Sequence, residues 1–166
     1  MVEGVSPVAK SAPLKTTIVV FSGDFDKAFA TFNIANGAAA SGHEVTLFFC
    51  LWGTLLLKKR GDRFKGPNIL SRMFSVMRPG GPAGISRMDM GRMGRWMMKK
   101  LLRDSGAATL EELMQSARDL GVRFIVCDLS LGVLGIKEDQ LRWVDTVAGA
   151  GTYIAEASES QVTLFI

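Results

Sequence analysis

The sequence predicts one α/β domain, built on a mostly parallel five-stranded sheet with helices on both faces. The chain has 166 residues, of which 48% are hydrophobic, and this is enough for one sizeable core. Strand-forming runs alternate with helix-forming runs, which is the order typical of parallel sheets. Residues 1–15 hold scattered Pro, Ser and Lys without a continuous apolar run. We therefore expect a flexible tail at 1–15, not a signal peptide, and a single domain at 16–166.

The first part of the predicted domain consists of two strands and the helix between them. Thr16–Ser22 and Glu44–Cys50 are rich in β-branched and aromatic residues, which predicts strands. Apolar residues at helical spacing separate them and predict a helix. This helix begins at Asp24, a candidate N-cap, and runs to about Ser41, where Gly42 is suited to end it.

A basic, methionine-rich insert at 61–104 interrupts the alternation. Before it, Leu51–Arg60 predicts the start of a helix that Gly53 interrupts. Between Lys58 and Arg103 the chain has thirteen Lys or Arg against two acidic residues, a net charge of +11. Because the whole chain has a net charge of +4, the remainder carries −7. Seven of the nine methionines also lie in this stretch, so its composition differs from that of the rest of the domain.

Within the insert, Asp89–Leu102 places methionines at helical spacing and predicts an amphipathic helix. Three roles remain open for the insert: docking of a partner protein, peripheral contact of Asp89–Leu102 with an anionic membrane, or packing within an oligomer. Nucleic-acid binding is not expected, because one aromatic residue between Arg78 and Arg103 is too few for base stacking. The longest apolar run, Val45–Leu57, is shorter than the ~20 residues that a membrane span needs.

The second part of the domain contains the clearest predicted helix. Thr109 and Glu112 have the spacing of a capping box, and Gly121 follows the apolar stripe. The next strand, Val122–Val126, leads directly to Cys127. The remaining expected elements are a helical turn at Lys137–Leu141, a strand at Trp143–Ala148, a helix from Gly149-Ala-Gly151 to about Glu159, and a strand at Gln161–Ile166. Trp143–Ala148 could instead extend the preceding helix.

Four of these strands are expected to end at one edge of the sheet, because right-handed crossovers keep parallel strands in the same direction. Ser22, Cys50, Cys127 and Gly149 would then share this edge. Ligands and reactive groups collect at the carboxyl ends of strands in α/β sheets. For each cysteine two readings remain open: a reactive thiol, or a small buried packing residue. Cys50 could be a second reactive thiol or a partner that condenses with Cys127.

Some residues near these cysteines could stabilise negative charge, either on a bound anion or on a cysteine thiolate. Ser22-Gly23-Asp24 could line a pocket or bind an anion through turn amides, and the alternative is a plain turn with an N-cap. Backbone N–H groups of a turn at Ser130–Gly135, and a helix start, could favour the Cys127 thiolate. Asp128 would act against this if its carboxylate faced the sulfur.

The inventory of side chains also excludes several kinds of site. The only histidine, His43, lies in a Gly-His-Glu turn, which leaves no Cys-His dyad or zinc cluster. There is no CxxC, GxGxxG or GxxxxGK[ST] motif, so we expect neither a metal nor a nucleotide cofactor. Two cysteines without a secretory signal indicate the reducing cytoplasm.

Several motifs together resemble the DsrE/DsrF/DsrH-like family of small sulfur-relay proteins. They are Ser22-Gly23-Asp24 after the first strand, the Ala-rich helix into Gly42-His-Glu-Val-Thr-Leu-Phe-Phe49, and Cys127-x-x-Ser130-x-x-x-x-Gly135-Ile136. Asp89-Met-Gly-Arg-Met-Gly-Arg-Trp-Met97 is similar to the larger DsrE-related branch, whose members carry sulfurtransferase or peroxiredoxin-like labels. The resemblance extends from about Thr16 to Ile166, but no Thr-x-x-Cys peroxidatic motif accompanies it.

This resemblance implies a three-layer, flavodoxin-like fold and homo- or hetero-oligomers of three or six subunits, and we expect a homo-oligomer here. It also implies that a cysteine carries sulfane sulfur as a persulfide, and that cysteine corresponds to Cys127. The expected site has Cys127 and Cys50 as its thiols. Its expected pocket residues are Ser22, Gly23, Asp24, Asp128, Ser130 and Gly149.

The predicted function is that of a sulfur carrier or sulfurtransferase subunit, which takes sulfur from a donor protein and passes it to an acceptor thiol. Whether the transfer is turned over as an enzymatic reaction stays open. The alternative is a non-catalytic assembly or membrane-docking adaptor, in which both cysteines are structural and the basic insert is the functional element.

Overall fold

The computed structural model describes residues 13–59 and 106–166. The predicted insert at 61–104, with its helix at Asp89–Leu102, lies outside the described residues, and so does most of the predicted tail. The first strand begins at Lys15, a residue that the sequence placed in the tail. None of the helices in the described parts is long and apolar enough to cross a membrane.

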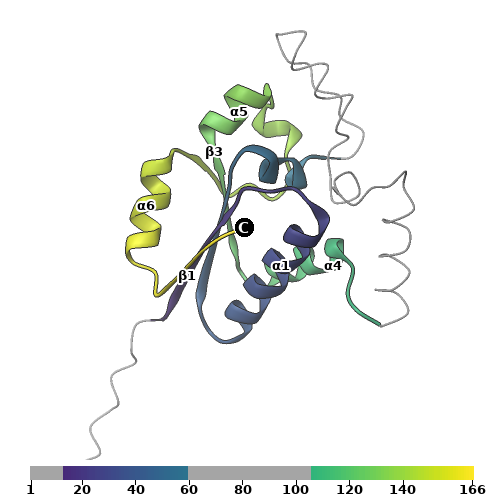
Figure 1. Ribbon diagram of the computed structural model, residues 1–166, viewed down its shortest axis with the longest axis vertical. Coiled ribbons are helices and arrows are strands. Elements are labelled where there is room, and N and C mark those ends of the chain that lie inside the picture. The colour runs from purple at the N-terminus through teal and green to yellow at the C-terminus, as the bar shows by residue number, and fades with distance from the viewer. Residues whose placement is uncertain (1–12, 60–105) are drawn as a thin grey trace, which may run out of the picture.

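A five-stranded sheet with the order β4-β3-β2-β1-β5 forms the centre of the molecule. Its four strand pairings are all parallel. Helices α1 and α4 cover one face and α6 covers the other, which gives three layers (Figure 1). The predicted fold class is therefore confirmed. The elements of the sheet and its covering helices are β1 (Lys15–Val20), α1 (Phe25–Ala40), β2 (Glu44–Phe49), α4 (Leu110–Asp119), β3 (Arg123–Cys127), β4 (Thr146–Ala148), α6 (Ala150–Ser158) and β5 (Val162–Phe165).

The main hydrophobic core lies between the sheet and helices α1 and α4. Its centre is a group of three fully buried phenylalanines, Phe32 of α1, Phe49 of β2 and Phe124 of β3. Their ring centroids lie 5.2–6.4 Å apart, the separation at which aromatic pairs attract. Side chains of a strand alternate between its two faces, so β2 contributes Leu47 and Phe49 to this core and turns Phe48 toward α6.

The opposite face, under α6, has a smaller apolar cluster. Phe48, Ile125 and Cys127 are its buried members, and Tyr153 of α6 packs against them. The described side chains of α6 are all at least partly exposed. This single helix therefore covers its face of the sheet more thinly than α1 and α4 cover theirs.

Local sequence signals fix α4 as predicted. Thr109 accepts a hydrogen bond from the Glu112 backbone N–H, and the Glu112 carboxylate accepts one from the Thr109 backbone N–H, which completes the capping box. Gly121 follows the helix with a φ of +79°, a left-handed conformation that glycine adopts without strain.

The start of α1 differs in detail from the prediction. Asp24 occupies the N-cap position, but its side chain makes no capping hydrogen bond. Instead, Ser22 Oγ accepts a hydrogen bond of 3.1 Å from the Asp24 backbone N–H. Strand β1 ends at Val20 rather than Ser22, because the N–H groups of Phe21 and Ser22 both donate to the carbonyl of Ile166.

The segment after β2 is a 3₁₀-helix, η1 (Leu51–Leu57). Gly53 lies inside it, so the prediction of a helix interrupted at Gly53 is wrong. A glycine is needed here because two segments of the backbone approach each other closely. A Cβ at Gly53 would lie 1.9 Å from the Val20 carbonyl oxygen. Only a residue without a side chain allows η1 to pack against the end of β1.

Two further elements correct the prediction. Ser130–Gly135 is not a turn, because Asp128–Leu134 forms helix α5, which ends at Gly135 with a φ of +64°. Strand β4 begins at Thr146 rather than Trp143. Trp143 has a φ of +63°, and this left-handed conformation is incompatible with an extended strand.

The predicted helical turn at Lys137–Leu141 is present as a short 3₁₀-helix, η2 (Glu138–Gln140).

Two glycine substitutions should change stability in opposite directions. We expect Gly53→Ala to lower the free energy of unfolding by about 2 kcal/mol or more, because the new methyl group would overlap the Val20 carbonyl. Gly37→Ala should raise it by about 0.5–1 kcal/mol, because a Cβ in that turn of α1 meets nothing within 4 Å. Urea denaturation would measure both, and equal effects would contradict the packing of η1 against β1.

Candidate functional site

The register of β2 and β3 brings the two cysteines together at the carboxyl edge of the sheet. Phe49 pairs with Val126, the last pair of the ladder, and Cys50 and Cys127 are the next residues along the two strands. Cys50 lies one residue beyond the end of β2 but keeps an extended backbone, with φ −130° and ψ 153°, so the chain continues in the direction of the strand at this residue. Neighbouring strands lie about 4.8 Å apart, which places the two cysteine backbones side by side.

Both thiols lie on the face of the sheet that α6 covers. Side chains of one strand return to the same face at every second residue, so Cys50 follows Phe48 and Cys127 follows Ile125 on that side. Cys50 accordingly packs against the cluster that contains Cys127. Tyr153 of α6 joins this cluster, with its ring centroid 5.4 Å from that of Phe48. The thiols therefore lie at the edge of an apolar patch beneath α6.

The two thiols differ in their surroundings. Cys127 is buried, with 7% of its surface exposed, whereas Cys50 is half-buried. Burial raises the pKa of the Cys50 thiol to about 11, with a smaller contribution in the same direction from negative charge on Cys127. Cys50 is therefore a neutral thiol at pH 7. Both cysteines are free.

The backbone directly after Cys50 is strained. Leu51 has a φ of +44°, a conformation that costs energy for a residue with a branched side chain. The hydroxyl of Ser130, on α5, accepts a hydrogen bond of 2.7 Å from the Leu51 N–H, and Ser130 is 1% exposed. Ser130 therefore ties the segment after one cysteine to the helix that follows the other.

Asp128 and Gly149 also meet at this edge. Cys127 pairs with Ala148 across β3 and β4, which brings the next residues of both strands together. Asp128 Oδ1 accepts a hydrogen bond of 2.6 Å from the Leu129 N–H and lies 3.8 Å from where a Cβ of Gly149 would be. The Asp128 carboxylate is thus engaged with the start of its own helix.

Ser22-Gly23-Asp24 lies at the same edge, beyond the end of β1. The Asp24 N–H donates to the Ser22 hydroxyl, and the Ser22 N–H donates to the carbonyl of Ile166. Among the described residues, no hydrogen bond joins this segment to Cys50 or Cys127. Its geometry matches a local turn that precedes α1, in which the Ser22 hydroxyl accepts a hydrogen bond from the Asp24 N–H.

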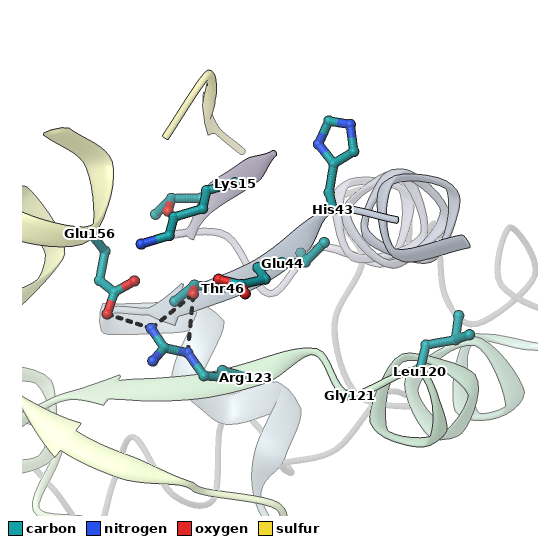
Figure 2. Close-up of a pocket in the computed structure, with 10 residues that line it drawn as sticks. Lys15, His43, Glu44, Thr46, Leu120, Gly121, Arg123 and Glu156 are labelled. Atoms are coloured by element: carbon teal, nitrogen blue, oxygen red, sulfur yellow. Dashed lines mark hydrogen bonds and ion pairs between the residues drawn. The ribbon is translucent and has the colours of Figure 1, made fainter. Parts of the chain in front are cut away.

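A cleft of about 420 Å³ opens at the opposite, amino-terminal edge of the sheet (Figure 2). Arg123 forms an ion pair with Glu156 of α6 and donates a hydrogen bond of 3.1 Å to Thr46 Oγ1. Lys15 pairs with Glu159 at 2.5 Å. The length of β2, roughly 20 Å, separates this cleft from the cysteines. Its charged groups fasten the end of α6, the helix that carries Tyr153.

Tyr153 and Leu51 are the residues of this site that the sequence did not predict. Tyr153 is the only tyrosine of the chain, and it lies one turn into the predicted helix after Gly149. That position could have drawn attention to it, because the start of this helix was expected at the cysteine edge. The left-handed backbone of Leu51 had no such signal, because glycine, asparagine or aspartate normally marks that conformation.

The cover that Tyr153 provides can be tested by alkylation of the native protein. We expect Tyr153→Ala to raise the alkylation rate of Cys127 roughly two- to tenfold, because an aromatic pair worth about 0.5–1.5 kcal/mol is lost. Tyr153→Phe keeps the ring and should react as the wild type does. Peptide mapping after timed iodoacetamide quenching measures both rates, and equal rates for all three proteins would contradict this role.

Comparison with known proteins identifies the family. A family model described as DsrE/DsrF/DrsH-like matches residues 13–165. The uncharacterised protein YrkE of Bacillus subtilis is 40% identical over 154 residues, which cover 92% of this chain and 96% of that protein. The sulfur carrier protein DsrE2 of Allochromatium vinosum is 30% identical over 163 residues, with 92% of this chain and 98% of that protein covered.

A solved structure shows the same fold. The protein of unknown function MTH1491 from Methanobacterium thermoautotrophicum superimposes with a TM-score of 0.54 at 13% identity. The match covers 92% of this chain and 99% of that one. The parallel sheet that brings two strand-end cysteines together is thus the scaffold of a known family, and the chain belongs to the DsrE/DsrF/DrsH-like proteins.

Proposed function

We propose that this protein is a sulfur carrier, in which Cys127 holds sulfane sulfur as a persulfide and passes it to a partner thiol. The observation that carries the proposal is a thiol at the carboxyl end of a central parallel strand, with a second thiol beside it. Membership of the family, and 30% identity with a relative named as a sulfur carrier, support a role in sulfur relay.

The transfer needs only thiol chemistry. The Cys127 thiolate attacks the outer sulfur of a donor persulfide, a new sulfur–sulfur bond forms, and the donor cysteine leaves as a thiolate. The acceptor thiolate then attacks the outer sulfur on Cys127, which leaves as a thiolate in turn. Neither step requires an external oxidant or reductant, because the sulfane sulfur keeps its oxidation level in both.

The surroundings of Cys127 indicate how a partner would reach it. Leu129 and Val133 of α5 are 68% and 60% exposed and lie one helical turn apart, directly after the thiol. Exposed apolar side chains of this kind suit contact with another protein. Since Tyr153 packs against the apolar cluster that contains Cys127, we expect α6 to shift when donor and acceptor thiols approach.

The partners, the oligomeric state and the location of the carrier complete the proposed function. The donor and the acceptor are proteins that present a reactive thiol, and the carrier works as a homo-oligomer, a trimer or a hexamer. We place it in the cytoplasm, where reducing conditions keep both cysteines free. Ser130 and Asp128 act as supporting residues, through their hydrogen bonds to the backbone next to each thiol.

Sulfur loading tests the proposal directly. After brief incubation with polysulfide, intact-mass spectrometry of the wild type should show one added sulfur atom that a reductant removes. Peptide mapping should place it on Cys127. Cys127→Ser should lose the added sulfur, whereas Cys50→Ser should still acquire it, because it retains the carrier thiol.

A folded wild type that gains no sulfur on Cys127 would contradict the carrier function. If Cys50→Ser lost the added sulfur and Cys127→Ser kept it, Cys50 would be the carrier thiol and the assignment to Cys127 would be wrong. Circular dichroism of each variant separates these outcomes from unfolding. Inert thiols together with salt-sensitive binding to anionic vesicles would instead match a docking adaptor.

A further inference from the structure

Cys50 gives the site a reaction beyond sulfur transfer. We propose that Cys50 discharges a persulfide on Cys127 within the same chain, which forms a Cys50–Cys127 disulfide and releases hydrogen sulfide. This inference rests on the proposed function, because it begins from the loaded carrier. Cys50 is then a resolving thiol, which removes the persulfide from Cys127 when no acceptor thiol has taken its sulfur.

The geometry of the two strands suits this bond. The register pairs Phe49 with Val126, the residues directly before the two cysteines, and Cys50 keeps an extended backbone. Strand spacing of about 4.8 Å falls within the range of about 4.4–6.8 Å over which disulfides join two Cα atoms. Both side chains point to the α6 face and share one apolar cluster. The two thiols are therefore placed for a bond between neighbouring strands.

The reaction balances without any added reagent. The Cys50 thiolate attacks the inner sulfur, Cys127 Sγ, and a bond between the two Sγ atoms forms. The bond from Cys127 Sγ to the outer sulfur breaks, and the outer sulfur leaves with its electron pair and is protonated to hydrogen sulfide. The Cys50 sulfur is oxidised and the outer sulfur is reduced. Attack on the outer sulfur instead would only move the persulfide to Cys50.

The surroundings of Cys50 keep this discharge slow at neutral pH. Burial raises the pKa of Cys50 to about 11, so about one molecule in ten thousand carries the attacking thiolate at pH 7. The titratable groups of its cluster in the described chain are the Cys127 thiol on β3 and Tyr153 on α6, and Asp128 follows Cys127 directly at the start of α5. The carrier thus retains sulfur long enough for an acceptor to bind.

The lifetime of the loaded protein tests this inference. Wild type and Cys50→Ser are loaded with polysulfide, freed of excess reagent, and followed by intact mass and by a sulfide assay. In the wild type, we expect loss of the added sulfur, release of sulfide and a product that lacks one hydrogen from each cysteine. The rate should rise roughly tenfold per pH unit from pH 7 to pH 10 and should not depend on protein concentration.

Cys50→Ser should keep its persulfide at least tenfold longer at pH 9, because the chain has no third cysteine. Cys50→Ala serves as a second variant if the serine disturbs folding. The pH series on the wild type needs no variant at all. Equal persulfide lifetimes in the wild type and both variants would overturn the inference while leaving the carrier function intact. A protein that never gains sulfur would overturn both.

Discussion

The register of β2 against β3 is the constraint on which the site depends. Each strand contributes one cysteine at its carboxyl end, and the pairing of Phe49 with Val126 sets the two thiols beside each other. A shift by one residue would turn one whole strand over. Phe49 or Phe124 would then leave the core under α1. The packing of these phenylalanines therefore also holds the thiols in place.

The face beneath α6 has two different ends. At the amino-terminal edge, Arg123 and Lys15 hold the end of α6 through Glu156 and Glu159. At the carboxyl edge, the same helix places Tyr153 over the apolar cluster that contains Cys127. Partly exposed ion pairs contribute little to stability, so this helix is fastened less firmly than those on the other face. A weakly attached α6 suits a thiol such as Cys127, which must be shielded from solvent and still be reached by a partner protein.

The sequence was sufficient for the fold and for the position of the thiols. Alternation of strand and helix predicted the parallel sheet, and crossover handedness placed Cys50 and Cys127 at one edge. Predicted element boundaries were wrong where backbone conformation or contacts between distant residues determine them. Trp143 adopts a left-handed conformation, and Gly53 packs against the Val20 carbonyl. Neither the packing of Tyr153 over the cluster nor the high pKa of Cys50 could be predicted, because both depend on how α6 crosses the sheet.

The measurement that tests the account most directly is disulfide formation in the native, sulfur-free protein. Wild type at low concentration is treated with diamide, quenched, and mapped without reduction. The register predicts a Cys50–Cys127 disulfide within one chain, formed while circular dichroism stays native. Two unreacted thiols, or disulfides only between chains, would contradict the placement of the cysteines side by side on which the proposed chemistry depends.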